Sequence, residues 1–267
     1  METRSKHRYN SLSASALDAY DSCPRYYECR YIKRLPTKQG GAMIAGSAYH
    51  RGVAYALGTI INGLSFTMEE VKTIVSEAWD GMVKSNSMKV DEEGNLIEVK
   101  HIDWGDKDPN TYKKTVLQLT ELYIATMLSN IDAVAVEKKH TREIAPGLVV
   151  IGYTDIELRD DNIIENKFST RRKSQGEVDN ENQPGVYAYL LDRPLTCTYH
   201  QALDQKKLDF NIVKTKRSRD DIDWIKNKML LTWKLIQTGV FPPQTNSWRC
   251  SMKYCEYYVD CRILHMF

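Results

Sequence analysis

The chain has 267 residues, of which 42% are hydrophobic and 27% charged, with a net charge of +2. These values are ordinary for a soluble globular protein with a sizeable core. The small net charge does not indicate nucleic-acid binding, so any such role must depend on local basic patches. No stretch approaches 18 apolar residues, and the basic start "METRSKHRYN" lacks the apolar region of a secretory signal. We therefore expect no membrane association and a reducing, cytoplasmic environment, in which six cysteines favour metal binding or catalysis over disulfides.

The first half of the chain predicts mainly helices. Ser13 or Ser15 can cap a helix that is broken near Pro24, and Thr67 with Glu70 forms a capping box. A glycine-rich turn is expected at 40–47, and a polar, irregular region, with a short hairpin, at 86–107. The predicted helices are 13–33, 47–61, 68–84 and one from Asp108-Pro109 to about 130.

The hydrophobic period changes after residue 131. Strands are predicted at 132–140, 147–158, 162–169, 195–203 and 208–214, with helices at 183–191 and 219–238. This order predicts an α/β fold with a mixed central sheet flanked by helices. We expect a single domain over 1–267, divided into a mainly helical portion (1–131), a sheet core (132–240) and a cysteine-rich C-terminal segment (241–267).

The segment "GYTDIELRDDNIIENKFS" contains the first group of residues with a chemical role. Glu165 and Lys167 are two apart on a strand and share one face, and Asp155 lies on the preceding strand. Asp155 lies opposite Glu165 if the loop has an odd number of residues centred on Asp160, and faces away if the number is even. Two carboxylates favour Mg²⁺ or Mn²⁺, and a lysine can stabilise charge on a phosphate. The alternative is a solvated strand face, although the apolar neighbours favour partial burial.

Three further side chains are candidates on helices. His50 in "GSAYHRGVAYAL" is either a structural residue or a metal ligand, and an imidazole added to two carboxylates suits Mn²⁺. Gln183 and Tyr187 in "QPGVYAY" share a helical face, although surface glutamine and packed tyrosine explain the pattern equally well. Pro184 places Gln183 in or just before the first helical turn.

The cysteines divide into two groups. Cys250, Cys255 and Cys261 have the spacing C-x4-C-x5-C, and Cys23 lies far upstream. Structural zinc sites usually combine two close pairs, so one plus three fits a thiolate-ligated iron–sulfur cluster better, with zinc remaining open. Cys29 and Cys197 have no partner pattern and are expected to be small core residues.

Taken in order, "LSASALDAYDSCPRYYECRYI", "GSAYH", "GYTD", "IIENK", "QPGVYAY" and the terminal cysteine run resemble the PD-(D/E)XK nuclease superfamily. The likeness covers nearly the whole chain and is greatest to the RecB-like branch with an iron–sulfur cluster. That branch includes AddB-type helicase-nucleases, CRISPR-associated adaptation nucleases and phage exonucleases. The resemblance implies a restriction-endonuclease-like core.

The resemblance also implies roles for individual residues. It implies metal ligation by His50, Asp155, Glu165 and the backbone carbonyl of Asn166, and it implies that Lys167 is the catalytic lysine. Gln183 and Tyr187 fall on the motif that contacts DNA or braces the active site. The residues in the positions of the 4Fe–4S ligands are Cys23, Cys250, Cys255 and Cys261.

The implied activity is a metal-dependent deoxyribonuclease, with exonuclease action on single- or double-stranded DNA ends in phage recombination, replication or repair. A single-strand annealing or recombination protein is an expected partner, in a bacterial host cytoplasm if the chain is phage-encoded. The alternatives are a CRISPR-adaptation nuclease that trims spacers and a non-catalytic DNA-binding module held by zinc or iron–sulfur. Basic groups at Arg171, Arg172 and Lys173, and at Lys214, Lys216, Arg217 and Arg219, are either phosphate contacts or solvated loops.

Overall fold

A computed structural model describes residues 10–37, 39–90, 96–98 and 102–263 of the chain. The α-helices are α1 (Ala14–Ser22), α2 (Pro24–Tyr27), α3 (Gly41–Ile61), α4 (Met68–Ser87), α5 (Pro109–Thr126), α6 (Gln175–Asp179), α7 (Asn182–Leu191) and α8 (Arg219–Gln237). Three short turns of other helical types are η1 (Glu28–Ile32), η2 (Leu128–Asn130) and η3 (Val259–Ile263).

The central sheet is mixed and has six strands. Its members are β1 (Ser11–Leu12), β6 (Ala133–Ala145), β7 (Leu148–Leu158), β8 (Ile163–Ser169), β9 (Leu195–Leu203) and β10 (Asp209–Arg217). The path β7-β8-β9-β10 has one parallel step, between β8 and β9, while β6 runs antiparallel to β7. Two small two-stranded pairs join β2 (Gln39–Gly40) to β5 (Ile102–Asp103) and β3 (Met88–Val90) to β4 (Leu96–Glu98).

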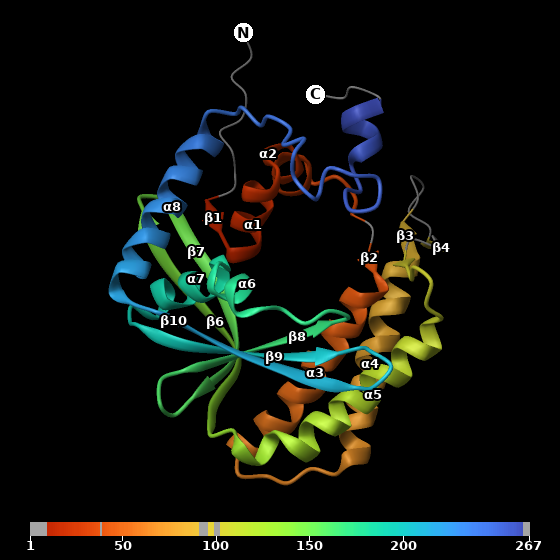
Figure 1. Cartoon of the computed structure of the whole chain (residues 1–267). Coiled ribbons are helices and arrows are strands. Elements are labelled where there is room, and N and C mark those ends of the chain that lie inside the picture. Colours follow the sequence, from red (N-terminus) through yellow and green to blue (C-terminus); the bar gives the residue numbers. More distant parts are fainter. Residues whose placement is uncertain (1–9, 38, 91–95, 99–101, 264–267) are drawn as a thin grey trace.

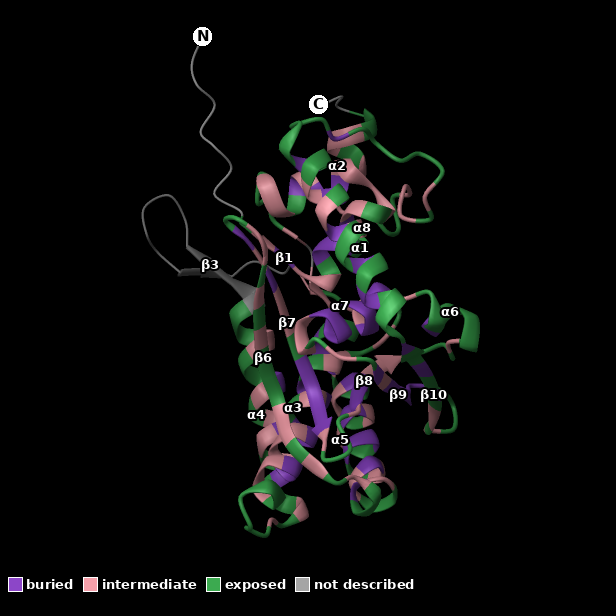
Figure 2. Ribbon diagram, turned by 90° about the vertical axis from the view of Figure 1, so that its left-hand side faces the viewer, coloured by how far each residue is buried: buried purple, intermediate pink, exposed green. Residues whose placement is uncertain are grey.

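The sheet separates two hydrophobic cores. Helices α1, α7 and α8 cover one face, and α3, α4 and α5 cover the other (Figure 1). Neighbouring residues of β8 take opposite sides, since Ile163 packs in the first core and Ile164 in the second. This alternation is expected for a strand that is covered on both faces. Figure 2 shows β7 largely buried beside the more exposed edge strand β6.

The ladder between β7 and β8 is much shorter than either strand. Pairing is confined to Ile156 with Ile164 and Glu157 with Ile163, whereas β8 pairs with β9 along the whole length of β8, from Ile163 to Ser169. Strands β7 and β8 therefore separate directly beyond Ile156 and Ile164. The fork that results opens at the next residue of each strand, which is Asp155 on β7 and Glu165 on β8.

The capping predictions for the helices are confirmed. The Ser13 side chain caps α1 and Asp108 caps α5. At the start of α4, the Thr67 backbone amide donates to the Glu70 carboxylate and the Glu70 backbone amide donates to the Thr67 hydroxyl. Gly239, with φ at +70°, follows the end of α8. Strand boundaries at 195–203 agree with the expected ones, and the hairpin in the 86–107 region is present as β3 and β4.

Two predictions are wrong in extent. Residues 40–47 do not form a turn, because α3 begins at Gly41 and includes the glycines that follow. The strand expected at 132–140 continues to Ala145, since its partner β7 supplies ladder pairs as far as Leu148. The strands β1, β2 and β5 and the short helix α6 were not predicted, and the three strands have only two residues each.

Candidate active site

The turn between β7 and β8 decides whether the carboxylates face one another. The Leu158 amide bonds to the Asn162 carbonyl (2.9 Å), which leaves three loop residues, and Asp161 has a left-handed backbone (φ +67°). The loop is thus odd and centred on residue 160. Extending the register of Ile156 with Ile164 places Asp155 opposite Glu165, as the sequence allowed.

Three buried groups meet at the fork of β7 and β8. Asp155, Glu165 and Asn166 have exposed fractions of 9%, 2% and 2%. The Asn166 backbone N–H donates to Asp155 Oδ2 (2.7 Å), and the Lys167 ammonium donates to Glu165 Oε1 (2.6 Å). The carboxylates and the lysine predicted from sequence therefore form one cluster.

Helix α7 completes the cluster from one face of the sheet. Gln183 donates to Glu165 Oε1 (2.8 Å) and accepts from the Lys167 ammonium (2.9 Å). The Tyr187 hydroxyl donates to the Tyr153 carbonyl (2.5 Å) or to Glu165 Oε2 (3.1 Å), and it accepts from Gln183 (2.6 Å). The Gln183–Tyr187 pair thus orients both Glu165 and Lys167.

Pro184 is compatible with this helix because it lies in its first turn. Helix α7 begins at Asn182, so Pro184 is its third residue, where the backbone amide has no partner within the helix. The close approach of α7 to β7 depends on Gly152. A Cβ atom there would lie 2.6 Å from Leu190 Cδ1 and 3.3 Å from Tyr187 Cε1.

The opposite face contributes His50 from α3, whose Nδ1 lies 3.6 Å from Asp155 Oδ2. A residue that the sequence did not indicate, Glu137 of β6, joins them. The ligand atoms of His50, Glu137 and Asp155 all lie within 4.8 Å of one another, the one such group among the described residues. A nitrogen and two carboxylate oxygens at this separation form a suitable donor set for Mg²⁺ or Mn²⁺.

The pKa values of the cluster reflect its burial. Burial, followed by the charge of Glu165, raises the pKa of Asp155 well above its usual range. Burial lowers the pKa of Lys167, but the charge and hydrogen bond of Glu165, together with the charge of Asp155, raise the pKa overall. Burial also lowers the pKa of His50, opposed by Glu165 and by a hydrogen bond with the Asn166 backbone. Lys167 is therefore held as a cation and His50 as a neutral imidazole.

The basic groups near the site are mostly engaged by the protein itself. Arg171 pairs with Glu177 (2.6 Å), Arg172 with Asp209 (2.6 Å), and Lys173 with Glu181. Arg217 is buried and donates to backbone carbonyls of Asp179 and Glu181, so it supports α6 and α7. Lys214 and Lys216 remain exposed on β10.

The cysteines again divide into two groups. Cys29 and Cys197 are buried in the first core, as expected, and burial raises the pKa of the Cys29 thiol to about 11. Cys23, Cys250, Cys255 and Cys261 line one pocket, although they come from opposite ends of the chain. Burial raises the pKa of Cys255 to about 11, and its neighbours include Cys23 and Cys261.

Direct contacts hold the C-terminal segment against α2 and η1. Tyr26 donates to Glu256 (3.2 Å), and its ring packs on that of Tyr257, with centroids 5.5 Å apart. The Tyr257 hydroxyl bonds to the Leu35 carbonyl (3.2 Å). Beside α1, Arg249 donates to the Ser22 hydroxyl (2.9 Å). The four-cysteine pocket therefore lies between two elements that are already packed together.

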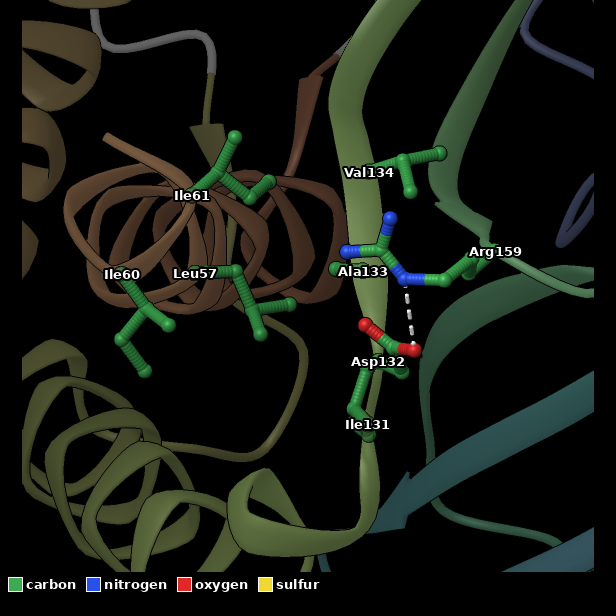
Figure 3. Close-up of a pocket in the computed structure, with 8 residues that line it drawn as sticks. All are labelled: Leu57, Ile60, Ile61, Ile131, Asp132, Ala133, Val134 and Arg159. Atoms are coloured by element: carbon green, nitrogen blue, oxygen red, sulfur yellow. Dashed lines mark hydrogen bonds and ion pairs between the residues drawn. The ribbon is translucent and has the colours of Figure 1, made fainter. Parts of the chain in front are cut away.

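A separate depression of about 380 Å³ lies where α3 ends and β6 begins. Figure 3 shows the ion pair between Arg159 and Asp132 (2.9 Å) beside apolar side chains. Its lining residues are Leu57, Ile60, Ile61, Ile131, Asp132, Ala133, Val134 and Arg159. None of the residues predicted to be catalytic or metal-binding lines it, so the fork of β7 and β8 remains the candidate site.

Comparisons with known proteins indicate the family and the fold of the chain. Residues 11–262 match the family model of the PD-(D/E)XK nuclease superfamily. No curated protein matches the chain. A crystal structure from Eubacterium rectale, described as "Putative exonuclease", aligns over 98% of this chain and 94% of its own, with 12% identity and a TM-score of 0.56. The crystal structure of SSO0001 aligns over 98% and 88%, with 16% identity and a TM-score of 0.43. Among the described residues, no helix is both long and apolar enough to cross a membrane.

Proposed function

Because the chain belongs to the PD-(D/E)XK nuclease superfamily, we propose that it is a metal-dependent deoxyribonuclease acting on DNA ends. The observation that carries the proposal is the convergence of Asp155, Glu165 and Lys167 at the fork of β7 and β8. Exonuclease action is favoured by the structural likeness to the described exonuclease and by the resemblance to phage enzymes. The substrate class follows from the family, whose members are nucleases.

Superfamily enzymes typically use a divalent cation, and the residues here fit one. The resemblance implies that His50, Asp155, Glu165 and the Asn166 carbonyl would hold it, and the structure places His50 Nδ1 3.6 Å from Asp155 Oδ2. A bound cation lowers the pKa of a water ligand and stabilises negative charge on a phosphodiester. Mg²⁺ and Mn²⁺ both suit oxygen ligands, and the neutral imidazole favours Mn²⁺.

Each protein group has a defined task in this proposal. Lys167 presents a cation to the phosphate while Glu165 and Gln183 fix its position. A hydrogen bond from the Tyr187 hydroxyl orients Glu165, and one from the Asn166 backbone N–H orients Asp155. Because these groups are held by one another before substrate binds, little reorganisation is needed for phosphodiester hydrolysis.

The four-cysteine pocket is proposed to hold a 4Fe–4S cluster. Tetrahedral zinc, with Zn–S distances of about 2.3 Å, requires sulfur atoms about 3.8 Å apart. Within the described part of the chain, no three cysteine sulfurs lie within 4.8 Å of one another. The one-plus-three arrangement of the cysteines along the chain favours an iron–sulfur cluster, which would join α1 and α2 to the C-terminal segment.

The catalytic proposal is tested with Asp155→Ala, Glu165→Ala and Lys167→Ala. Each variant is incubated with end-labelled single- and double-stranded DNA, with and without Mn²⁺. We expect each to lose cleavage by at least about a hundredfold while DNA binding persists, since binding depends on other contacts. Glu121→Gln, which removes an exposed carboxylate of α5 paired with Lys72, is the matched control. Wild-type cleavage by any of the three site variants contradicts the proposal.

A further inference from the structure

Glu137 has an unusual backbone for its place in the fold. Its φ is +48°, although it lies in the middle of the 13-residue strand β6. Left-handed backbone is uncommon for a residue other than glycine and costs about 1 kcal/mol or more. The ladder continues on both sides, with Val136 opposite Ile156 and Lys138 opposite Thr154. The strained residue therefore lies directly across from Asp155.

The Glu137 carboxylate lies at the proposed metal centre. Its ligand oxygen, the imidazole nitrogen of His50 and a carboxylate oxygen of Asp155 are within 4.8 Å of one another. The three residues come from three different elements, β6, α3 and β7. Acidic residues that are merely neighbours on one surface strand would not bring together side chains from three elements.

Glu165, by contrast, is already occupied by protein donors. Its Oε1 accepts from Lys167 and Gln183, and its Oε2 lies 3.1 Å from the Tyr187 hydroxyl. These donors restrict how far Glu165 can turn toward a cation on the His50 side. Glu137, on the other side of Asp155, offers a carboxylate oxygen on the His50 side of the site.

We propose that Glu137 is a further metal ligand of this site and that its left-handed backbone directs the carboxylate toward His50 and Asp155. The inference rests on the proposed nuclease function, because it adds a ligand to the same divalent-cation centre. The geometry that supports this role is the mutual approach of the three side chains from three different elements.

The competing explanation is that Glu137 serves only as a counter-charge. Arg51, which follows His50 on α3, lies close enough to lower the pKa of Glu137. In that case the Glu137 carboxylate stabilises the contact between α3 and β6 through Arg51 and does not bind the metal. The two explanations differ in the affinity for Mn²⁺ measured without DNA.

The test is a calorimetric titration of the purified full chain with Mn²⁺, without DNA. Glu137→Gln removes the charge, and Glu137→Gly removes the side chain while permitting the left-handed backbone. We expect both to bind Mn²⁺ at least about tenfold more weakly than wild type, as for other residues that support metal sites. The control, Glu121→Gln, is expected to bind like wild type.

The outcomes separate this inference from the proposed function. Mn²⁺ affinity in Glu137→Gln and Glu137→Gly equal to that of wild type overturns the role of Glu137 and leaves the nuclease proposal intact. Absence of Mn²⁺ binding by wild type overturns both. We also expect Glu137→Gly to denature at a higher temperature than wild type without metal, because glycine removes the backbone strain.

Discussion

His200 is a buried imidazole that is paired with a tyrosine hydroxyl. Its exposed fraction is 8%, and Nδ1 lies 2.9 Å from the Tyr123 hydroxyl in the core beside α5. Burial, with a smaller effect of the Lys214 charge, lowers its pKa from 6.5 to about 4. The imidazole is therefore neutral in the folded protein at pH values where the unfolded chain already binds a proton.

The stability of the protein should fall as the pH drops from about 6.5 to about 4. The folded state binds fewer protons than the unfolded state in this window, so acid favours unfolding. The shift in the pKa of His200 contributes on the order of 3 kcal/mol to the free energy of unfolding, and about 2 kcal/mol of this contribution is lost by pH 5. Denaturant titrations at pH 7 and pH 5 measure it.

His200→Gln provides the comparison for this pH effect. The variant has no group titrating in the window at this position, so its free energy of unfolding should fall less between pH 7 and pH 5. Parallel pH dependence in wild type and variant contradicts the assignment to His200.

Single residues differ in how far the sequence can predict their roles. Asp155, Glu165, Lys167, Gln183 and Tyr187 follow recognisable spacings, and the odd loop between β7 and β8 was one of two stated possibilities. Glu137 could not be found in this way. Its position at the site depends on a left-handed backbone inside a strand, which no local pattern in "AVAVEKKH" indicates.

At the level of elements, the main incorrect prediction was the glycine-rich turn at 40–47. Glycines at 40–47 suggested a turn, but in the structure they permit close packing of a helix. A Cβ at Gly41 would lie 2.5 Å from the Trp104 ring, and one at Gly46 would contact Phe168 at 3.5 Å. Glycine thus serves helix contacts here, and the contacts that show this are more than fifty residues away in sequence.

Gly152 likewise permits close packing between β7 and α7, next to the candidate active site. We expect Gly152→Val to displace α7, because its side chain would overlap Leu190 and Tyr187. Overpacking of this kind typically costs about 1–3 kcal/mol. Displacement would also move Tyr187 from Glu165, so cleavage should decrease together with the free energy of unfolding.

Two further variants separate overpacking from a general effect of replacing glycine. Gly152→Ala combined with Leu190→Ala should be less destabilised than the sum of the two single changes, since Leu190 is the nearest contact. Gly81→Ala in α4, where a Cβ meets nothing within 4 Å, is the control and should not destabilise the protein. Strict additivity of the two changes argues against overpacking at Gly152.

At the scale of the whole molecule, the C-terminal segment packs against α2, near the start of the described chain. Figure 1 shows the last segment beside α2, and Cys23 Sγ accepts from the Gln244 amide (3.3 Å). The family resemblance implied this connection by placing Cys23 with the C-terminal cysteines. It did not reveal the buried side chains Phe241 and Tyr257, which pack on the N-terminal helices and hold the segment independently of any cluster.

Cys23→Ala should therefore destabilise the protein far more than Cys29→Ala or Cys197→Ala. Structural metal sites contribute on the order of 10 kcal/mol, whereas removing a small buried thiol costs about 1–2 kcal/mol. We expect wild type to be brown and to contain iron, and Cys23→Ala to lose iron and denature at a lower temperature. Phe241 should keep the residues up to Arg249 in place through its packing on Tyr27, so that proteolysis in the Cys23→Ala variant is limited to residues after Arg249. Equal iron content and melting temperature in Cys23→Ala and Cys29→Ala contradict the cluster, because Cys29 lies in the core and Cys23 in the pocket with Cys250, Cys255 and Cys261.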